Sequence, residues 1–199
     1  DGLQWVFEAF IVLRNEEYSL GWQRVEIAMK DIDTSAWERE ARDKNMDAVQ
    51  ALIILHRSYE NPLAKKALVD MDINWIIHNA VNGSYRAYDL LLQLAGMQLH
   101  PIELLLSQAD ARPLLENINE GDNDALRIAR PLKYSYDNES ADEVLKSVNP
   151  RAFVLKIARG EDMDESVRAV EILYHFENKK VSQSLRENLS LKRIYEIAN

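Results

Sequence analysis

A short run of apolar residues that ends in glycine recurs in this sequence at a nearly constant interval. The three copies are INWIIHNAVNGS at residues 73–84, ARPLLENINEGD at 111–122 and RAFVLKIARGED at 151–162. The positions fifteen, six and three residues before each glycine are apolar, and the same register recurs once more near the end of the chain, at spacings of 38, 39 and 40 residues. Because only about half of residues are apolar on average, this agreement indicates an internal repeat.

We expect these apolar positions to be buried and equivalent. The leucines fifteen residues before the glycines, with their counterpart in the last window, are Leu68, Leu106, Leu145 and Leu185. The residues six before are Ile77, Leu115 and Val154, and those three before are Ala80, Ile118 and Ile157, followed in the last window by Ile194 and Ile197.

Each copy divides into three predicted helices. Short first helices are expected at 61–70, 100–108, 139–147 and 180–188, two of them opening with proline, which suits a first turn. The second helix is the quoted phrase, ended by a glycine that can adopt a left-handed conformation at low cost. The third helix is longer, with apolar residues at three- and four-residue spacing, as in SYRAYDLLLQLAG, NDALRIARPLKYSY and DESVRAVEILYHF.

We therefore expect residues 1–199 to form one continuous array rather than several domains. Its predicted parts are a partial repeat at 1–21, a degenerate repeat at 22–60, full repeats at 61–99, 100–138 and 139–178, and a partial repeat at 179–199. The degenerate repeat lacks the glycine but contains a predicted third helix at 45–59. Since both ends fall inside a repeat, we expect a fragment of a longer array, with atypical capping repeats as the alternative.

A short helix, a second helix and a longer third helix repeating about every 40 residues resembles the armadillo repeat, with the related HEAT repeat as the near alternative. The resemblance covers roughly residues 22–199. It implies an all-α fold, a right-handed α-solenoid whose third helices line the concave face. The Asn and Trp ladder of importin-type armadillo proteins is not matched, because the tryptophans at 5, 22, 37 and 75 occupy different repeat positions. An ordinary helical bundle is the competing interpretation.

Composition and charge exclude several classes of function. The chain is 47% hydrophobic and 29% charged, which is typical of an ordered protein. A net charge of −9 disfavours nucleic-acid binding, since affinity for phosphates depends on Lys and Arg. The absence of cysteine excludes disulfides and thiolate zinc sites. No apolar run is long enough for a membrane span, and no signal peptide is evident, so we expect a cytoplasmic protein.

Catalytic and metal-binding patterns are weak in this sequence. Two histidines share a possible helical face with an acid, His100 with Glu103 and His175 with Glu171. A di-iron bundle site would need Glu-x-x-His motifs, and the chain has none. Nucleotide-binding, metalloprotease and hydrolase signatures are also absent. We expect no cofactor, no metal and no enzymatic activity; a helical enzyme with an unrecognised carboxylate and histidine site is the alternative.

Tyrosine and arginine concentrate on the predicted third helices, and these residue types are enriched at protein-interaction hot spots. The candidate partner-binding residues are Tyr85, Tyr88, Arg127, Arg130, Tyr134, Arg168 and Tyr174. We expect them to share one solvent-reachable surface that binds a peptide segment or a helix of another protein. The alternative is that the tyrosines only fill the core between repeats. The sequence leaves the partner and the oligomeric state open.

Overall fold

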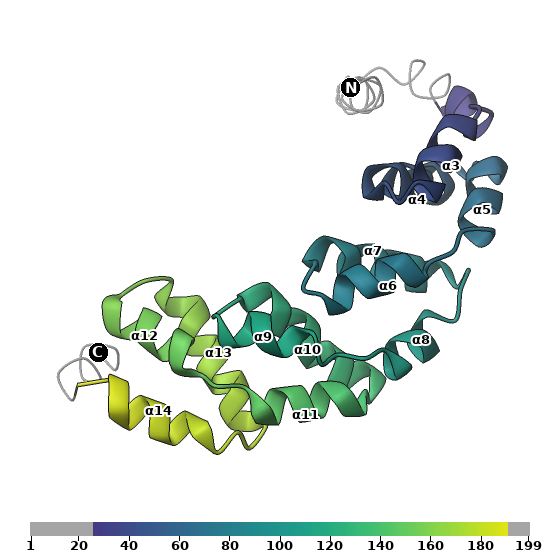
Figure 1. Ribbon diagram of the computed structural model, residues 1–199. Coiled ribbons are helices and arrows are strands. Elements are labelled where there is room, and N and C mark those ends of the chain that lie inside the picture. The colour runs from purple at the N-terminus through teal and green to yellow at the C-terminus, as the bar shows by residue number, and fades with distance from the viewer. Residues whose placement is uncertain (1–25, 191–199) are drawn as a thin grey trace. The chain divides into compact units, whose positions relative to one another are not determined.

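The computed structural model describes residues 26–190, and within this range every regular element is a helix (Figure 1). The all-α prediction is therefore confirmed for this part of the chain. None of the described helices is both long and apolar enough to cross a membrane. The chain divides into two compact units: the first runs to Ile73 and also holds Gln93–His100, and the second holds Asn74–Leu92 and the chain from Pro101 onward. The two units are described separately.

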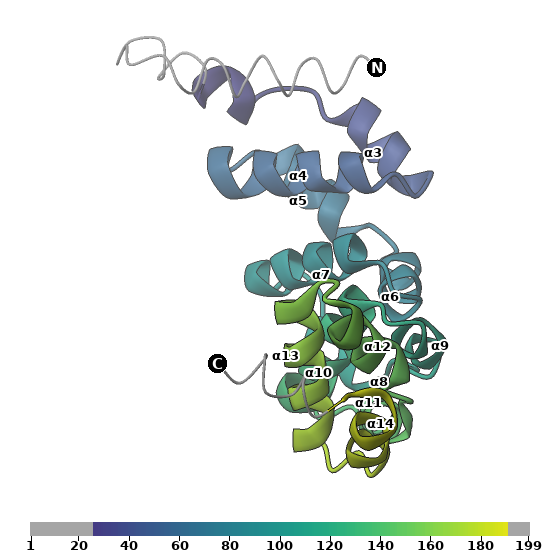
Figure 2. The ribbon, with the colours of Figure 1, turned by 90° about the vertical axis from the view of Figure 1, so that its left-hand side faces the viewer.

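The helices fall close to their predicted positions. The first unit contains α3 (Ser35–Arg42), α4 (Met46–Tyr59) and α5 (Pro62–Val69). The second contains α6 (Asn74–Val81), α8 (Ile102–Gln108), α9 (Leu114–Asn119), α10 (Asn123–Tyr136), α11 (Glu139–Ser147), α12 (Arg151–Arg159), α13 (Met163–His175) and α14 (Lys180–Asn188), while α7 (Tyr85–Met97) contributes residues to both. In the first unit α4 packs against α3 and α5 (Figure 2). In the second, α10 contacts α8, α9, α11 and α13, and α12 contacts α13 and α14.

The repeated glycines end the second helices as predicted. Gly83, Gly121 and Gly160 follow α6, α9 and α12 with φ angles of 99°, 88° and 77°. A side chain at Gly83 would be strained by this conformation, and its Cβ would also lie 2.5 Å from the side-chain nitrogen of Asn117. Glycine is therefore needed there for both the turn and the close approach of the next second helix.

A buried asparagine precedes the first helix α5 and ties it to a segment about thirty residues earlier. Asn61 is fully buried, and its Nδ2 donates to the carbonyls of Met29 (2.9 Å) and Ile32 (3.2 Å). Its Oδ1 accepts the N–H of Ala64 at 2.8 Å and so caps α5. One side chain thus satisfies two carbonyls and one N–H, which would otherwise be costly to bury. We call this arrangement the asparagine clip.

The clip recurs twice in the second unit. Asn138 Nδ2 donates to the carbonyls of Leu106 (2.8 Å) and Ala109 (2.7 Å), and its Oδ1 accepts the N–H of Ala141 (2.8 Å). Asn178 Nδ2 donates to the carbonyls of Leu145 and Val148, each at 2.9 Å, and its Oδ1 accepts the N–H of Lys180 at 3.0 Å. In each clip the two carbonyls are three residues apart, and in the second unit they lie at the end of the preceding first helix, α8 or α11.

His100 takes the place of the asparagine in one copy. Its Nε2 lies 2.7 Å from the carbonyl of Leu68, in the first unit. Because a carbonyl only accepts, Nε2 must carry the proton in this contact. The helix that follows, α8, has Pro101 as its N-cap residue and no side-chain cap. The histidine therefore supplies one of the three bonds of the asparagine clip.

The predicted leucine positions are buried in three of four copies. Leu68, Leu106 and Leu145 have no exposed surface, and their carbonyls accept the bonds from His100 and the clips. Leu185 is only half-buried, so the expectation was wrong there. Ile194 and Ile197 lie outside the described residues.

The second-helix positions were partly misassigned. Ala80, Ile118 and Ile157 are buried as predicted, and so is Val154. Ile77 and Leu115, however, are only half-buried. The residues immediately before the predicted ones are fully buried in all three copies, namely Ile76, Leu114 and Phe153. These lie four residues before the confirmed positions, so both share the one helical face that packs inward.

Truncation of a clip tests its energetic role. Asn138→Ala leaves the carbonyl of Leu106 and the N–H of Ala141 buried without their partners, so we expect unfolding to become easier by about 3 kcal/mol. Urea unfolding followed by circular dichroism measures this change. Asn149→Ala is the matched control, because Asn149 is exposed and its side chain caps only the Arg151 N–H. A loss for Asn138→Ala no greater than for this control would show that the clip is not a main source of stability.

The copy in which His100 stands in place of the asparagine allows the opposite test, in which a clip is added rather than removed. Asn61 precedes Pro62, and His100 precedes Pro101, so His100→Asn recreates the same Asn-Pro pair. The amide should retain the bond to the Leu68 carbonyl, reach the Met71 carbonyl three residues later and cap α8. We expect a gain of about 1 kcal/mol in unfolding free energy. His100→Ala should destabilise, and a destabilised His100→Asn protein would mean that the imidazole is required for packing.

Candidate protein-interaction surface

The seven predicted binding residues all lie on α7, α10 and α13, within the second unit. Six are exposed: Tyr85, Arg127, Arg130, Tyr134, Arg168 and Tyr174. Tyr134 and Tyr174 each keep 63% of their surface accessible, which is high for aromatic side chains. Tyr88 is 3% exposed, so the expectation that it is reachable by solvent was wrong.

Helices α10 and α13 pack side by side and run in the same direction (Figure 2). Near their starts, Arg127 Nη2 and Asn123 Nδ2 contact the carboxylate of Glu165 at 3.0 and 3.1 Å. Near their ends, the rings of Tyr134 and Phe176 lie 4.9 Å apart between centroids. A residue of α10 therefore faces one about forty positions later on α13, as the repeat predicts.

Arg127 is held within a network of acids. Its guanidinium pairs with Asp124 on its own helix at 3.2 Å and with Glu165 on α13 at 3.0 Å. All three side chains are about half accessible, so the pairs are solvated and contribute little to stability. Their effect is to neutralise the charge of Arg127.

Tyr134 is the best-supported exposed aromatic residue of this surface. One side of its ring packs at a tilt of 49° against Phe176, which is buried. Arg130 lies one turn earlier on the same helix, with its Cζ 5.9 Å from the ring centroid. Both contacts are favourable and restrict the ring, while most of its surface stays open. Arg130 and Tyr134 thus form one cluster with Phe176, which we call the Tyr134 cluster.

The other predicted residues are not all joined to this cluster. The Tyr174 ring contacts the His175 ring edge-on at 6.3 Å between centroids. Tyr85 lies 6.3 Å from Tyr88 on α7. Arg168 is exposed in the middle of α13. These side chains are presented by the same set of helices, but no direct contact links them to Tyr134.

Tyr88 has a structural role instead. It lies on the inward face of α7 with Leu91, and its hydroxyl is hydrogen-bonded to that of Tyr136. Burial, followed by the neighbouring tyrosines, raises the pKa of Tyr88 well above the ordinary value. Burial raises the pKa of Tyr136 as well. The alternative that the tyrosines fill the core is therefore correct for Tyr88. Tyr85, three positions earlier on the same helix, is exposed instead.

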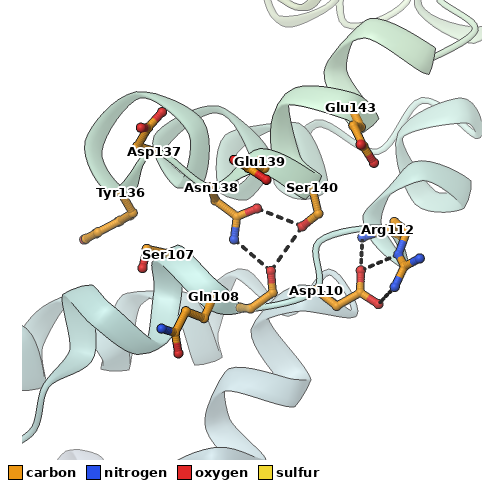
Figure 3. Close-up of a pocket in the computed structure, with 11 residues that line it drawn as sticks. Ser107, Gln108, Asp110, Arg112, Tyr136, Asp137, Asn138, Glu139, Ser140 and Glu143 are labelled. Carbon is orange, nitrogen blue, oxygen red and sulfur yellow. Dashed lines mark hydrogen bonds and ion pairs between the residues drawn. The ribbon is translucent and has the colours of Figure 1, made fainter.

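A depression of about 720 Å³ lies at the joint closed by the Asn138 clip (Figure 3). At its floor, the Asn138 amide and the Ser140 hydroxyl both donate to the Ala109 carbonyl. Arg112 pairs with Asp110 at its edge. The remaining acids around it are exposed and point into solvent. The polar groups at the floor are hydrogen-bonded to one another. The depression is therefore explained by the packing of this joint.

The histidines and acids were the other candidates for a site. No group of three or more His, Cys, Asp or Glu residues in the described range is arranged to hold a metal ion. His100, which shares a face with Glu103 in the sequence, is engaged with the Leu68 carbonyl. Sequence reasoning missed the support of Tyr134 by Phe176 and the clips. The recurrence of asparagine at 61, 138 and 178 was a readable signal for the clips.

Comparison of the chain with protein-family models, with curated proteins and with solved structures finds no match.

The raised pKa of Tyr88 predicts a loss of stability at alkaline pH. Because tyrosine in an unfolded chain titrates near pH 10, the unfolded state releases its proton before the folded state does. The contribution of Tyr88 is therefore complete below about pH 10 and is lost as pH rises further. Tyr88→Phe should lower the unfolding free energy by about 1 kcal/mol at pH 7. The same variant should show a shallower fall of the unfolding free energy at alkaline pH. Urea unfolding from pH 7 to 11 measures both, and Tyr134→Phe, at an exposed position, is the control. An unchanged slope in Tyr88→Phe would contradict the assignment.

Proposed function

We propose that this chain is a non-enzymatic binding module, built as a right-handed armadillo- or HEAT-like α-solenoid with the repeat boundaries given above. Its exposed third-helix surface in the second unit would bind an extended segment or a helix of another protein. The observation that carries the proposal is the Tyr134 cluster, in which a largely exposed tyrosine is held in place beside an arginine.

The repeat itself is supported by equivalent contacts at equivalent places. Within the second unit, the clips of Asn138 and Asn178 each join a first helix to the end of the preceding one. The Asn61 clip in the first unit uses the same three bonds. A regular spacing of such joints is expected of stacked repeats, in which each unit contacts mainly its neighbours.

An exposed tyrosine that is already ordered is suited to binding. Association costs entropy when flexible side chains become fixed, and Tyr134 has lost part of this freedom to Phe176 and Arg130. Tyr and Arg combine a large apolar area with polar groups, and they dominate interaction hot spots. Elsewhere on this surface Tyr85 and Tyr174 add further exposed aromatic area. The surface therefore has the composition of a protein interface.

The remaining parts of the proposal rest on the sequence. We propose no cofactor and no nucleic-acid partner, because the chain lacks the relevant motifs and is strongly acidic. The cytoplasm is the compartment we propose. The stoichiometry of the protein in solution is left open.

Selection from a displayed library of random twelve-residue peptides tests the proposed function. Peptides that bind the wild-type protein are titrated against an Arg130→Ala, Tyr134→Ala double variant by fluorescence anisotropy. We expect affinity to fall by roughly thirtyfold, because loss of hot-spot residues costs at least about 2 kcal/mol. The matched control is Leu104→Ala, Arg159→Ala, at exposed positions of α8 and α12 in the same unit.

Circular dichroism and urea unfolding establish that both variants remain folded. Peptides that bind wild type and the Tyr134 variant equally well would contradict the proposed surface. Failure to select any peptide that depends on Arg130 and Tyr134 would also contradict the proposed surface.

A further inference from the structure

The charges around Arg130 are unusual for a chain with a net charge of −9. On its own helix, the residues three positions before and after it are Arg127 and Lys133, both basic. The residues four positions before and after it are Leu126 and Tyr134, so none of these neighbours is acidic. Helical neighbours at these spacings normally supply the compensating charge. Arg130 therefore lacks an acidic partner from its own helix.

The neighbouring helix adds a further cation. Arg130 lies three residues after Arg127 on α10, and Arg168 lies three residues after Glu165 on α13, so the Arg127–Glu165 contact puts the two cations at a similar level along these helices. Among the residues that the structure describes, neither Arg130 nor Arg168 forms an ion pair, whereas Arg127 and Lys133 pair with Glu165 and Asp137. Arg130 and Arg168 are thus two exposed guanidinium groups, without an ion pair in the described structure, near the middle of α10 and of α13.

Arg168 has acidic neighbours on its own helix, α13. Asp164 and Glu171 flank Arg168 by one turn on either side, and both are exposed. They moderate the charge of Arg168 without forming an ion pair with it in the described structure. Arg130 receives no such compensation from α10. An anion bound between α10 and α13 would therefore gain most from Arg130.

Resting on the proposed function, we propose that the bound protein segment carries a carboxylate side chain next to an aliphatic or aromatic one. The carboxylate binds Arg130, with Arg168 as the second cation, and the apolar side chain packs on the open face of Tyr134. Arg130 is already 5.9 Å from the Tyr134 ring, so the two contacts fall on adjacent residues of the ligand. A fork of guanidinium donors suits a carboxylate, and the ring supplies the apolar area.

The peptides selected on the wild-type protein provide the test. We expect enrichment of Asp or Glu beside Leu, Ile, Val or an aromatic residue, and binding that weakens as salt is raised. Arg130→Gln should reduce the affinity of these peptides roughly two- to fivefold, as loss of an exposed charged contact does. Arg130→Lys, which keeps the charge, should recover part of it. Glu171→Gln should increase affinity, because it removes the opposing carboxylate. Arg159→Gln, an exposed charge at the end of α12, is the control.

The outcomes separate this inference from the function on which it rests. Peptides that need Tyr134 but show no acidic enrichment, and that bind Arg130→Gln as well as wild type, would overturn the inference and leave the binding module intact. Enrichment of Lys or Arg would also overturn it. The absence of any Tyr134-dependent peptide would overturn both. Acidic peptides with the stated changes for Arg130→Gln and Glu171→Gln would support it.

Discussion

The structure depends on how the carbonyl groups at the end of each first helix are satisfied. The bonds to four of these carbonyls are buried and those to Ile32 and Ala109 are part-buried, and a buried unpaired carbonyl is costly. An asparagine side chain supplies two N–H donors to the earlier helix and one oxygen to the N–H of the helix that it begins. Asn61, Asn138 and Asn178 have this role. The same side chain therefore ends one element and positions the next.

The position of the candidate surface follows from that constraint. In the second unit, the clips at Asn138 and Asn178 lie at the starts of α11 and α14 and bond the N–H groups of Ala141 and Lys180 there. The third helices that precede these clips, α10 and α13, pack against each other. This packing pairs Arg127 with Glu165 and brings Tyr134 against Phe176. Arg130 and Arg168 lie at a similar level on these two helices, and neither forms an ion pair among the described residues.

Periodicity and glycine placement predicted the helices and their ends, because these depend on local sequence. Gly83, Gly121 and Gly160 have the expected left-handed conformation. The inward face of the short second helices was predicted one residue off in two of the three copies, since a helix of six to nine residues has too few turns to define its face. The burial of Tyr88 depends on its contact with Tyr136, forty-eight positions later, which no local pattern contains.

The clips were missed for a related reason. An asparagine before a helix is a common N-cap, and nothing in the local sequence indicates that its amide also reaches carbonyls about thirty residues earlier. Only recurrence of asparagine in the repeat register could have indicated it. The copy with His100 obscures that recurrence.

Native-state amide hydrogen exchange in the wild-type protein tests the clip most directly. The N–H groups of Ala64 and Ala141 each donate to a clip oxygen, whereas Glu103, at the same distance after His100, lies in the first turn of α8, which has no side-chain cap. If the clips hold the joints, Ala64 and Ala141 should exchange only through large-scale unfolding, and Glu103 should exchange much faster through local opening. Equal protection at all three amides, or faster exchange at Ala64 and Ala141, would contradict this account.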